Sequence, residues 1–264
     1  MHKILYFIFF IFLIPINVFS ENLVIQSTTS TRDSGLYKYL LPKYPYNSDI
    51  KIKVIAVGTG QAIKNAENCD GNILIVHDEA RELEFMSKGY GVKRHELMYN
   101  DYVLIGPSND QDISKSTAIA DAFSRIHDKK YKFVSRSDSS GTHSAELAVW
   151  RKLSLNPRVG SGEWYLESGQ GMGPSLNIAV ALNGYIFSDR SSWLRFKNKR
   201  NHKILYENRR ELKNNYGMIL VNHNRCSNLN YNYSLDLFNW LSSDEAANHI
   251  REYRLNNQNV FYID

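Results

Sequence analysis

Dense runs of lysine and arginine are absent from this chain of 264 residues, although its formal net charge is +5. Proteins that follow the phosphate backbone of nucleic acids carry such runs, so we exclude nucleic acid as a partner. Hydrophobic residues make up 43% of the chain and charged residues 22%, which is typical of a globular protein with a full core. The length suits one large domain or two lobes.

A hydrophobic run long enough to span a membrane is missing from the N-terminus. The apolar run at residues 4–14 follows Lys3 and is shorter than the ~20 residues of a membrane-spanning helix. Val18-Phe19-Ser20 then resembles a small-x-small cleavage site. Residues 1–20 are therefore predicted to be a cleaved secretory signal peptide, and we expect a soluble, exported mature protein.

Cysteine is scarce as well. No cysteine follows the predicted cleavage site directly, which excludes a lipid-anchored N-terminus. The chain contains Cys69 and Cys226, which could pair in an oxidising compartment. Their spacing does not decide between a disulfide and two unlinked thiols, so both hypotheses stay open.

The most informative stretch is Phe-Val-Ser-Arg-Ser-Asp-Ser-Ser-Gly-Thr-His at residues 133–143. Two β-formers lead into a polar turn, and apolar residues at helical spacing follow from Leu147. A turn between a strand and a helix N-terminus presents unpaired backbone N–H groups and the positive end of the helix dipole. The turn adds one guanidinium and several hydroxyl donors, so it predicts an anion site built from Arg136, Ser139, Ser140 and Thr142.

The alternative for this stretch is that Ser140 or Thr142 only caps a helix and that Arg136 is a solvated surface charge. Two further turns of the same kind favour the anion site. Residues 23–25 lead into Ser-Thr-Thr-Ser-Thr at residues 27–31, and the predicted strand at residues 50–57 leads into Gly-Thr-Gly at residues 58–60. The latter is too short for a dinucleotide fingerprint and lacks the lysine of a P-loop.

The alternation of strand and helix patterns predicts an α/β protein with mostly parallel sheets. In such sheets ligands bind outside the carboxyl ends of the strands, where all of these turns lie, so we expect the turns to converge on one anion. Residues 198–210 are basic and are interpreted as solvated surface. Further strands are predicted at residues 72–76, 99–107, 185–187 and 217–222, and helices at residues 119–126, 176–180 and 235–241.

Two short motifs in the sequence are compatible with other kinds of site. His77-Asp78-Glu79 could suggest a metal site, but no second pair of ligands stands at the required spacing, so no metal and no cofactor are expected. Ser139 or Ser140 close to His143 could suggest the nucleophile and base of a hydrolase. Because no Gly-x-Ser-x-Gly elbow is present and triad members usually come from distant segments, we do not expect an enzyme.

An ordered set of motifs across the mature chain resembles the TupA family, the periplasmic tungstate-binding proteins of ABC uptake systems. Met-Tyr-Asn-Asp at residues 98–101 and Gly-Gln-Gly-Met-Gly at residues 169–173 are the most specific members of this set. The others are Ser-Thr-Thr-Ser-Thr (27–31), Ser-Gly-Leu (34–36), Val-Gly-Thr-Gly (57–60), Ile-Val-His (75–77), Ile-Gly-Pro (105–107), Ser-Arg (135–136) with Asp138, Ser-Gly-Thr-His (140–143) and Ser-Asp-Arg (188–190).

The resemblance implies a two-lobed α/β periplasmic binding protein of type II-like fold. Two mostly parallel mixed sheets flanked by helices would close on a tetrahedral oxyanion in the interlobe cleft. Residues 21–101 with 217–264 would form lobe I and residues 102–216 lobe II, with residues 99–103 and 216–220 as crossing hinge strands. The ligand would be tungstate, with molybdate as a second candidate, delivered by a monomer to the permease of an ABC transporter in the inner membrane.

The resemblance also implies a ligand set, namely Thr28, Thr29, Ser30, Thr59, Arg136, Ser140 and Thr142. Two departures from the family pattern occur. Arg136-Ser137-Asp138 stands where the family usually has Arg-Gly-Asp, and residues 69–72 replace a Gly-Asp-Ala-Asp pattern. Asp138 could also accept a hydrogen bond from a protonated anion, which keeps a phosphate-binding protein of the same fold as the alternative.

Overall fold

The computed structural model describes residues 21–46 and 50–264, so the predicted signal peptide lies outside the described residues. The strands are β1 (Glu21–Thr28), β2 (Ile50–Val57), β3 (Ile73–Val76), β4 (Gly91–Pro107), β5 (Phe133–Ser135), β6 (Tyr165–Glu167), β7 (Tyr185–Asp189), β8 (His202–Glu207), β9 (Lys213–Val221), β10 (Arg254–Leu255) and β11 (Gln258–Asn259). The helices are α1 (Thr29–Ser34), α2 (Leu36–Leu40), α3 (Thr59–Glu67), α4 (Glu79–Ser87), α5 (Ile119–Asp128), α6 (Gly141–Lys152), α7 (Met172–Ala181), α8 (Arg190–Arg195), α9 (Tyr231–Leu241) and α10 (Asp244–Glu252).

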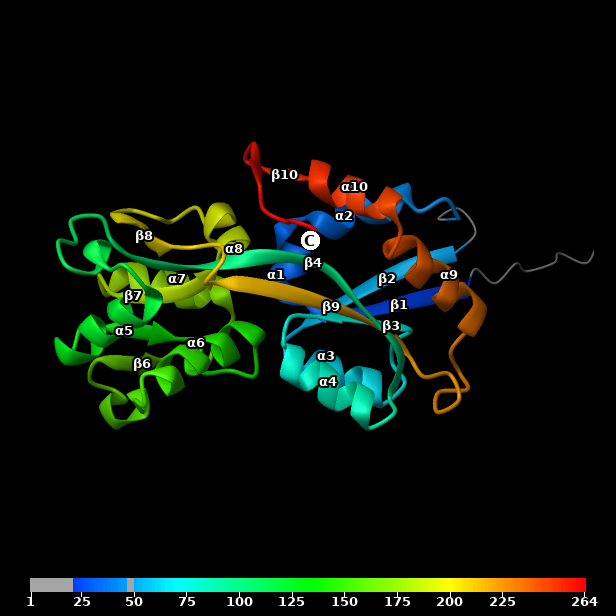
Figure 1. The fold of residues 1–264 in the computed structure, drawn as a ribbon, viewed down its shortest axis with the longest axis horizontal. Helices are drawn as coiled ribbons and strands as arrows, with labels where there is room; N and C mark the ends of the chain where they lie inside the picture. The colour runs from blue at the N-terminus through cyan, green and yellow to red at the C-terminus, as the bar shows by residue number, and fades with distance from the viewer. Residues whose placement is uncertain (1–20, 47–49) are drawn as a thin grey trace, which may run out of the picture.

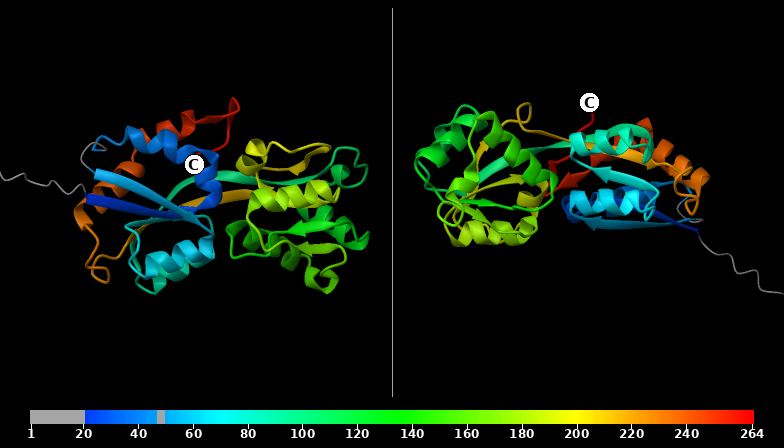
Figure 2. Two further views of the ribbon diagram at one scale, coloured as in Figure 1. Left: turned by 180° about the vertical axis from the view of Figure 1, so that it is seen from behind. Right: turned by 90° about the horizontal axis from the view of Figure 1, so that it is seen from below.

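The molecule consists of two lobes that lie side by side and are joined by β4 and β9 (Figure 1; Figure 2). The strand order is β2-β1-β3-β9-β4-β7-β5-β6, and β8 also pairs with β4. Pairing is parallel among β1, β2 and β3 and among β5, β6 and β7. By contrast, β4 and β9 run antiparallel to their neighbours. Each lobe therefore has a mixed sheet, and the two sheets are continuous through β4.

The long strand β4 extends further back than the sequence predicted. Its first part, from Gly91 to Asp101, pairs with β9 in the first lobe, and its second part, from Tyr102, pairs with β7 in the second. Residues 92–96 hide this first part in the sequence, because they are mostly polar, are exposed or half-exposed, and resemble a solvated loop. The strand carries the chain from one lobe to the other without a break.

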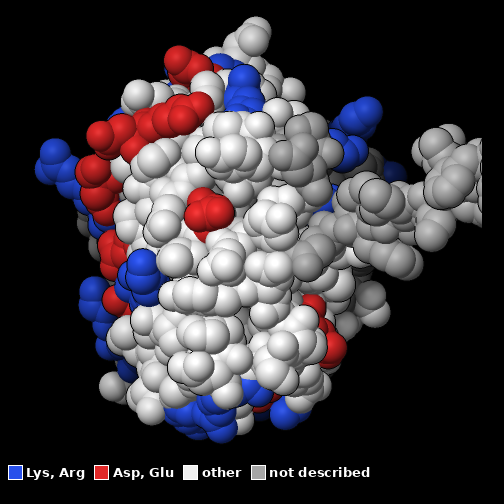
Figure 3. All heavy atoms as spheres, turned by 90° about the vertical axis from the view of Figure 1, so that its right-hand side faces the viewer, with Lys and Arg blue, Asp and Glu red and all other residues white. Residues whose placement is uncertain are grey.

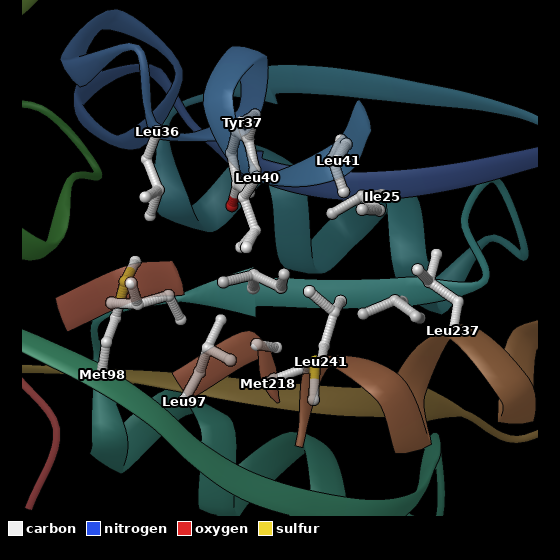
Figure 4. Packing of buried hydrophobic residues seen from close by; sticks show 14 of the residues in the cluster. Ile25, Leu36, Tyr37, Leu40, Leu41, Leu97, Met98, Met218, Leu237 and Leu241 are labelled. Carbon is white, nitrogen blue, oxygen red and sulfur yellow. The ribbon is translucent and has the colours of Figure 1, made fainter. Parts of the chain in front are cut away.

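Helices cover both faces of each sheet. In the first lobe, Leu40 of α2 and Leu241 of α9 pack against Ile25 and Met218 of the sheet (Figure 4). Ala62 of α3 and Phe85 of α4 cover the opposite face. The second lobe has the same arrangement, with α5 and α6 on one face and α7 and α8 on the other. Burial on both faces explains the continuous apolar run at residues 73–76.

The interpretation of residues 198–210 as solvated surface is wrong in part. His202 to Glu207 form strand β8, which pairs with the second part of β4. His202 and Tyr206 are buried, whereas Lys203 between them is exposed. The strand alternates between a buried and an exposed face, but the flanking basic residues obscure that alternation in the sequence.

Cys69 and Cys226 form a disulfide, which settles the choice that their spacing left open. The bond joins the turn before β3 to the loop after β9. It lies at the outer end of the first lobe, away from the strand ends that face the cleft. A pocket of about 610 Å³ lies beside it, lined by residues of β1 and of both connected loops.

The outer end of the first lobe is drawn in Figure 3. Uncharged side chains occupy most of its middle, and charged groups of both signs lie mainly toward its edges. The positive net charge is therefore not gathered on the part of this face that the figure shows. Among the described helices, none combines the length and the apolar character that crossing a membrane requires.

Candidate functional site

The turns that the sequence singled out meet between the lobes. The turn after β2 belongs to the first lobe and the turn after β5 to the second, and they are joined by two hydrogen bonds. The backbone N–H of Gly60 donates to the carbonyl of Ser139 at 3.1 Å. The N–H of Gly141 donates to Oγ1 of Thr59, also at 3.1 Å. Thr59 is fully buried by this contact. The lobes therefore touch at the N-termini of α3 and α6.

Arg136 is held in place by its own turn. Its side chain is 6% exposed, and Nη2 donates to Oδ2 of Asp138 at 2.5 Å. The other oxygen of Asp138 accepts hydrogen bonds from the hydroxyl of Ser140 at 2.5 Å and from its backbone N–H at 3.2 Å. Asp138 thus fixes the direction of the guanidinium and ties it to the residue that caps α6. The solvated-surface interpretation of Arg136 is wrong.

Two buried polar atoms of this turn have no hydrogen-bond partner among the described residues. They are Nε of Arg136 and Oγ1 of Thr142, and both residues are at least 95% buried. A buried donor without an acceptor costs free energy, so each such group calls for an explanation, and a bound ligand is one that fits two donors side by side in one turn. Since Thr142 lies in the first turn of α6, the positive end of that helix lies beside these donors. The arrangement suits an anion.

The hydroxyl groups of the first lobe are arranged differently. Thr28 Oγ1 lies 2.9 Å from the hydroxyl of Thr31 and 3.2 Å from that of Ser30, so these groups satisfy one another. Thr28 and Ser30 are buried, whereas Thr29 is half-buried.

Thr29 and Ser30 line a pocket of about 400 Å³ between α1 and the N-terminal turn of α7. A second pocket of about 390 Å³, lined by His77, Tyr102 and Gly141, lies between the lobes as well.

Buried rings connect the hydroxyls of the first lobe to the turn of Arg136. The rings of His77 and Tyr216 stack with their centroids 4.9 Å apart. Burial raises the pKa of Tyr216 above its ordinary value, and the neighbouring hydroxyls of Ser30 and Thr31 oppose that shift. Burial lowers the pKa of His77, and the nearby charge of Arg136 adds to this effect. The hydroxyls of the first lobe thus act on Tyr216, and the charge of Arg136 acts on the His77 ring stacked against it.

His77 is fixed by the strands that cross between the lobes. Its Nδ1 lies 3.0 Å from Oδ1 of Asn214 and 3.2 Å from the hydroxyl of Tyr102. Asn214 also donates to Oδ1 of Asn100 at 2.6 Å. This buried polar network couples the wall of the cleft to β4 and β9. The sequence offers a partial signal for it, because His77 follows a buried strand, Asn100 stands in the motif at residues 98–101 and Tyr216 begins a predicted crossing strand. It offers no signal for Asn214.

Asp189 places a carboxylate close to these rings. It is the last residue of β7 and caps α8, and its Oδ1 accepts hydrogen bonds from Ser191 Oγ at 2.5 Å and from the Ser192 N–H at 2.9 Å. Its Oδ2 is buried without a partner among the described residues. Asp189 stands opposite Tyr102 in the sheet, and its charge raises the pKa of His77 against the effect of burial. Among the described residues, Asp189 thus adds an unpartnered acceptor near the donors of the site.

The arrangement of Ser140 and His143 does not resemble a nucleophile with its base. The Ser140 hydroxyl donates to Asp138 and accepts from the backbone N–H of His143. The ring of His143 instead faces Ser135 and Glu146, and both of these lie on the same ring nitrogen, Nδ1. A proton relay needs one partner on each nitrogen. Ser139 is exposed and contributes its carbonyl to the contact between the lobes.

The chain matches the family model of the PBP superfamily domain over residues 20–245. It is 38% identical over 237 residues to the tungstate-binding protein TupA of Peptoclostridium acidaminophilum, which covers 88% of this chain and 81% of that protein. It is 37% identical over 239 residues to the TupA of Campylobacter jejuni, with 89% of this chain and 88% of that protein covered.

Solved structures agree with these relatives. The crystal structure of the tungstate ABC transporter from Geobacter sulfurreducens superimposes with a TM-score of 0.80 at 38% identity, over 88% of this chain and 99% of that one. The tungstate-binding protein TupA of Desulfovibrio alaskensis also gives a TM-score of 0.80, at 34% identity over 92% of this chain and 98% of that one. The chain therefore belongs to the PBP superfamily and, within it, to the family of the TupA tungstate-binding proteins.

Proposed function

We propose that this protein captures tungstate in the periplasm, accepts molybdate as a second ligand, and delivers its ligand to the permease of an ABC transporter in the inner membrane. The observation that carries the proposal is the pair of buried, unpartnered donors, Arg136 Nε and Thr142 Oγ1, at the contact between the lobes. Membership of the TupA family supports the identity of the anion.

The chemistry of the donors suits a dianion. Tungstate carries no proton at neutral pH, so its oxygens only accept hydrogen bonds, and each donor of the site can serve one of them. A guanidinium is permanently charged and keeps a rigid fork of N–H groups, which matches two oxygens of a tetrahedral anion. The N-terminus of α6 adds its dipole to the same place.

We propose a ligand set that is narrower than the sequence predicted. Arg136 and Thr142 contact the anion from the second lobe, and Thr28, Ser30 and Thr59 from the first. Ser140 acts through the helix cap and through Asp138, to which its hydroxyl is bound. Thr29 and Ser139 are more exposed and lie at the rim of the cleft. No metal and no cofactor take part.

We propose that the lobes close on the ligand as units of residues 21–101 with 217–264 and of residues 102–216, in a monomer. The contacts at the N-termini of α3 and α6 support this motion, because they join segments that hinge rotation about β4 and β9 would separate. The test is small-angle scattering, in which saturating tungstate should lower the radius of gyration. Equal radii with and without the anion would contradict closure.

One observation favours a second candidate, hydrogen phosphate. This anion carries a proton that needs an acceptor. The sequence offered Asp138 for this role, but both of its oxygens already accept hydrogen bonds. Asp189 Oδ2 is instead buried without a partner. A phosphate-binding protein of the same fold would use Asp189 as that acceptor.

Calorimetric titration with tungstate, molybdate, phosphate and sulfate distinguishes the candidates. We expect tight binding of tungstate and no tight binding of phosphate. Asp189→Asn sharpens the test, because asparagine also caps helices well but cannot accept through both atoms of its head group. Tungstate affinity should stay equal or rise, since a neighbouring negative charge is removed. Tight phosphate binding that Asp189→Asn abolishes would overturn the proposal.

A further inference from the structure

Arg81 bridges the lobes without belonging to the donor set. It lies in the first turn of α4 in the first lobe, where its Nε forms an ion pair with Asp78 Oδ2 at 3.3 Å. Its Nη1 donates to the backbone carbonyl of Ser139 in the second lobe at 3.1 Å. Nη2 reaches the hydroxyl of Ser144 on α6 at 3.5 Å. A single side chain of α4 thus contacts both α6 and the turn that precedes α6.

The carbonyl of Ser139 is the shared acceptor of this contact. It receives both the N–H of Gly60 and the guanidinium of Arg81. Gly60 fits closely here, because a Cβ at this position would lie 3.0 Å from Ser139 Cβ and 3.3 Å from Arg81 Nη1. Ser139 directly precedes the helix cap of α6, in the turn that also carries Arg136 and Thr142. Gly60 and Arg81 therefore bind the same turn that is proposed to bind the ligand.

Resting on the proposed function, we propose that Arg81 is a latch: a positioning residue that stabilises the closed state from outside the ligand site. Its hydrogen bonds to Ser139 and Ser144 exist only when the lobes touch. Its ion pair with Asp78 lies within the first lobe and persists when the lobes separate. The guanidinium is thus held ready in the open state, and closure adds the contacts to the second lobe. A ligand that orders the turn at Ser139 presents the carbonyl that Arg81 binds.

The latch predicts a change in affinity with no lost ligand contact. Arg81→Gln should weaken tungstate binding about tenfold, which is about 1.4 kcal/mol. The loss stays moderate because the Arg81 side chain is 37% exposed, and water weakens such contacts. Arg81→Lys keeps the charge but loses the fork, so its affinity should lie between those of the wild type and Arg81→Gln. Ser144→Ala should cost less than either.

Lys88→Gln is the matched control. Lys88 follows the same helix and carries the same charge, but its ammonium pairs with Glu84 inside the first lobe at 2.6 Å. This variant removes the same long-range attraction for an anion without removing a contact between the lobes. Its affinity for tungstate should stay within about twofold of the wild type, well under one tenfold step.

Calorimetry gives the affinities, and small-angle scattering at saturating ligand gives the degree of closure. Thermal unfolding of the ligand-free proteins checks that Arg81→Gln and Lys88→Gln have equal stability. A lower affinity and a larger liganded radius for Arg81→Gln alone support the latch. Equal affinities of Arg81→Gln and Lys88→Gln would overturn it. If the wild type binds another of the four oxyanions instead of tungstate, the proposed function fails, and the same variants test the latch with that anion.

Discussion

The two walls of the cleft are built from the same local unit, a strand, a polar turn and a helix N-terminus, yet they differ in how their donors are used. In the first lobe the hydroxyls of Thr28, Ser30 and Thr31 bond to one another. In the second lobe Arg136 Nε and Thr142 Oγ1 are buried without partners among the described residues. The charge also belongs to the second lobe, whereas the first lobe contributes neutral groups.

This difference suggests an order of events. The second lobe keeps its donors oriented and unpaired among the described residues, so we expect it to bind the anion first. In the first lobe the hydroxyls bond to one another when no ligand is bound, so they are not left unsatisfied, and they can exchange these bonds for bonds to the ligand. Closure then brings Thr59 and Gly60 against the turn at residues 139–141. The variants below test this asymmetry.

The largest effect is expected for Arg136→Gln. The substitution removes the charge and the fork, and hydrogen bonds to charged groups contribute roughly 1.5–3 kcal/mol each. We expect a loss of at least about 3 kcal/mol, or on the order of 100-fold in tungstate affinity by calorimetry. Arg136→Lys should lie between this variant and the wild type. Binding of Arg136→Gln within about threefold of the wild type would show that the second lobe does not carry the charge compensation.

The next largest effect concerns closure alone. A Cβ on Gly141 would lie 2.6 Å from the carbonyl oxygen of His77 and 2.7 Å from its ring, across the contact between the lobes. Gly141→Ala should therefore keep every donor but hold the lobes apart, lowering tungstate affinity by about 30-fold, or 2 kcal/mol. Gly173→Ala is the control, because a Cβ there meets no atom within 4 Å. Wild-type affinity of Gly141→Ala would mean that the ligand needs only one lobe.

A direct comparison of the two walls uses one threonine from each. Thr142→Val removes an unpaired donor of the second lobe and should cost about 1.4 kcal/mol, or tenfold in affinity. Thr28→Val removes a hydroxyl that already bonds to its neighbours, and its effect on affinity should be smaller, about threefold. Both are measured by calorimetry. The reverse order would place the first contact with the anion in the first lobe.

The smallest effect is expected for Cys69→Ser. The disulfide lies in the turn before β3, at the opposite end of that strand from His77. Tungstate affinity should stay within about twofold of the wild type, provided that the variant is folded. A tenfold loss of affinity in a folded variant would mean that the outer end of the first lobe, where the disulfide lies, influences ligand binding at the cleft.

Much of the fold could be predicted because its units are local. The turns at residues 58–60 and 135–142 each follow a strand and open a helix, as their patterns indicated, whereas at residues 27–31 strand β1 passes directly into α1 without a separate turn. The missing parts depend on distant neighbours. Strand β8 exists because β4 offers it an edge, and residues 91–98 become a strand because β9 lies beside them. Neither partner is visible in the local sequence.

The same limit applies to the site. The candidate ligand residues could be proposed from motifs, and their contacts with the anion stay a prediction. The role of Arg81 could not be proposed in this way, because its contacts with Ser139 and Ser144 form only where the lobes meet. The stacking of Tyr216 on His77 could not be proposed either, because it depends on strands that are distant in the sequence. Asp138 is a further example. The sequence suggests it as an acceptor for a ligand, but in the folded turn its two carboxylate oxygens accept hydrogen bonds from Arg136 and Ser140.

The disulfide between Cys69 and Cys226 has a topological consequence. The two cysteines are 157 residues apart, and every element from α5 to α8 lies between them. The whole second lobe therefore lies inside a covalently closed loop, which also contains β3, α4 and β9 of the first lobe and whose disulfide is at the outer end of that lobe. Cross-linking a loop of this length lowers the entropy of the unfolded chain, a stabilisation of about 5 kcal/mol in the loop-entropy model. If the second lobe unfolds transiently, the two chain segments of the first lobe remain tethered to each other.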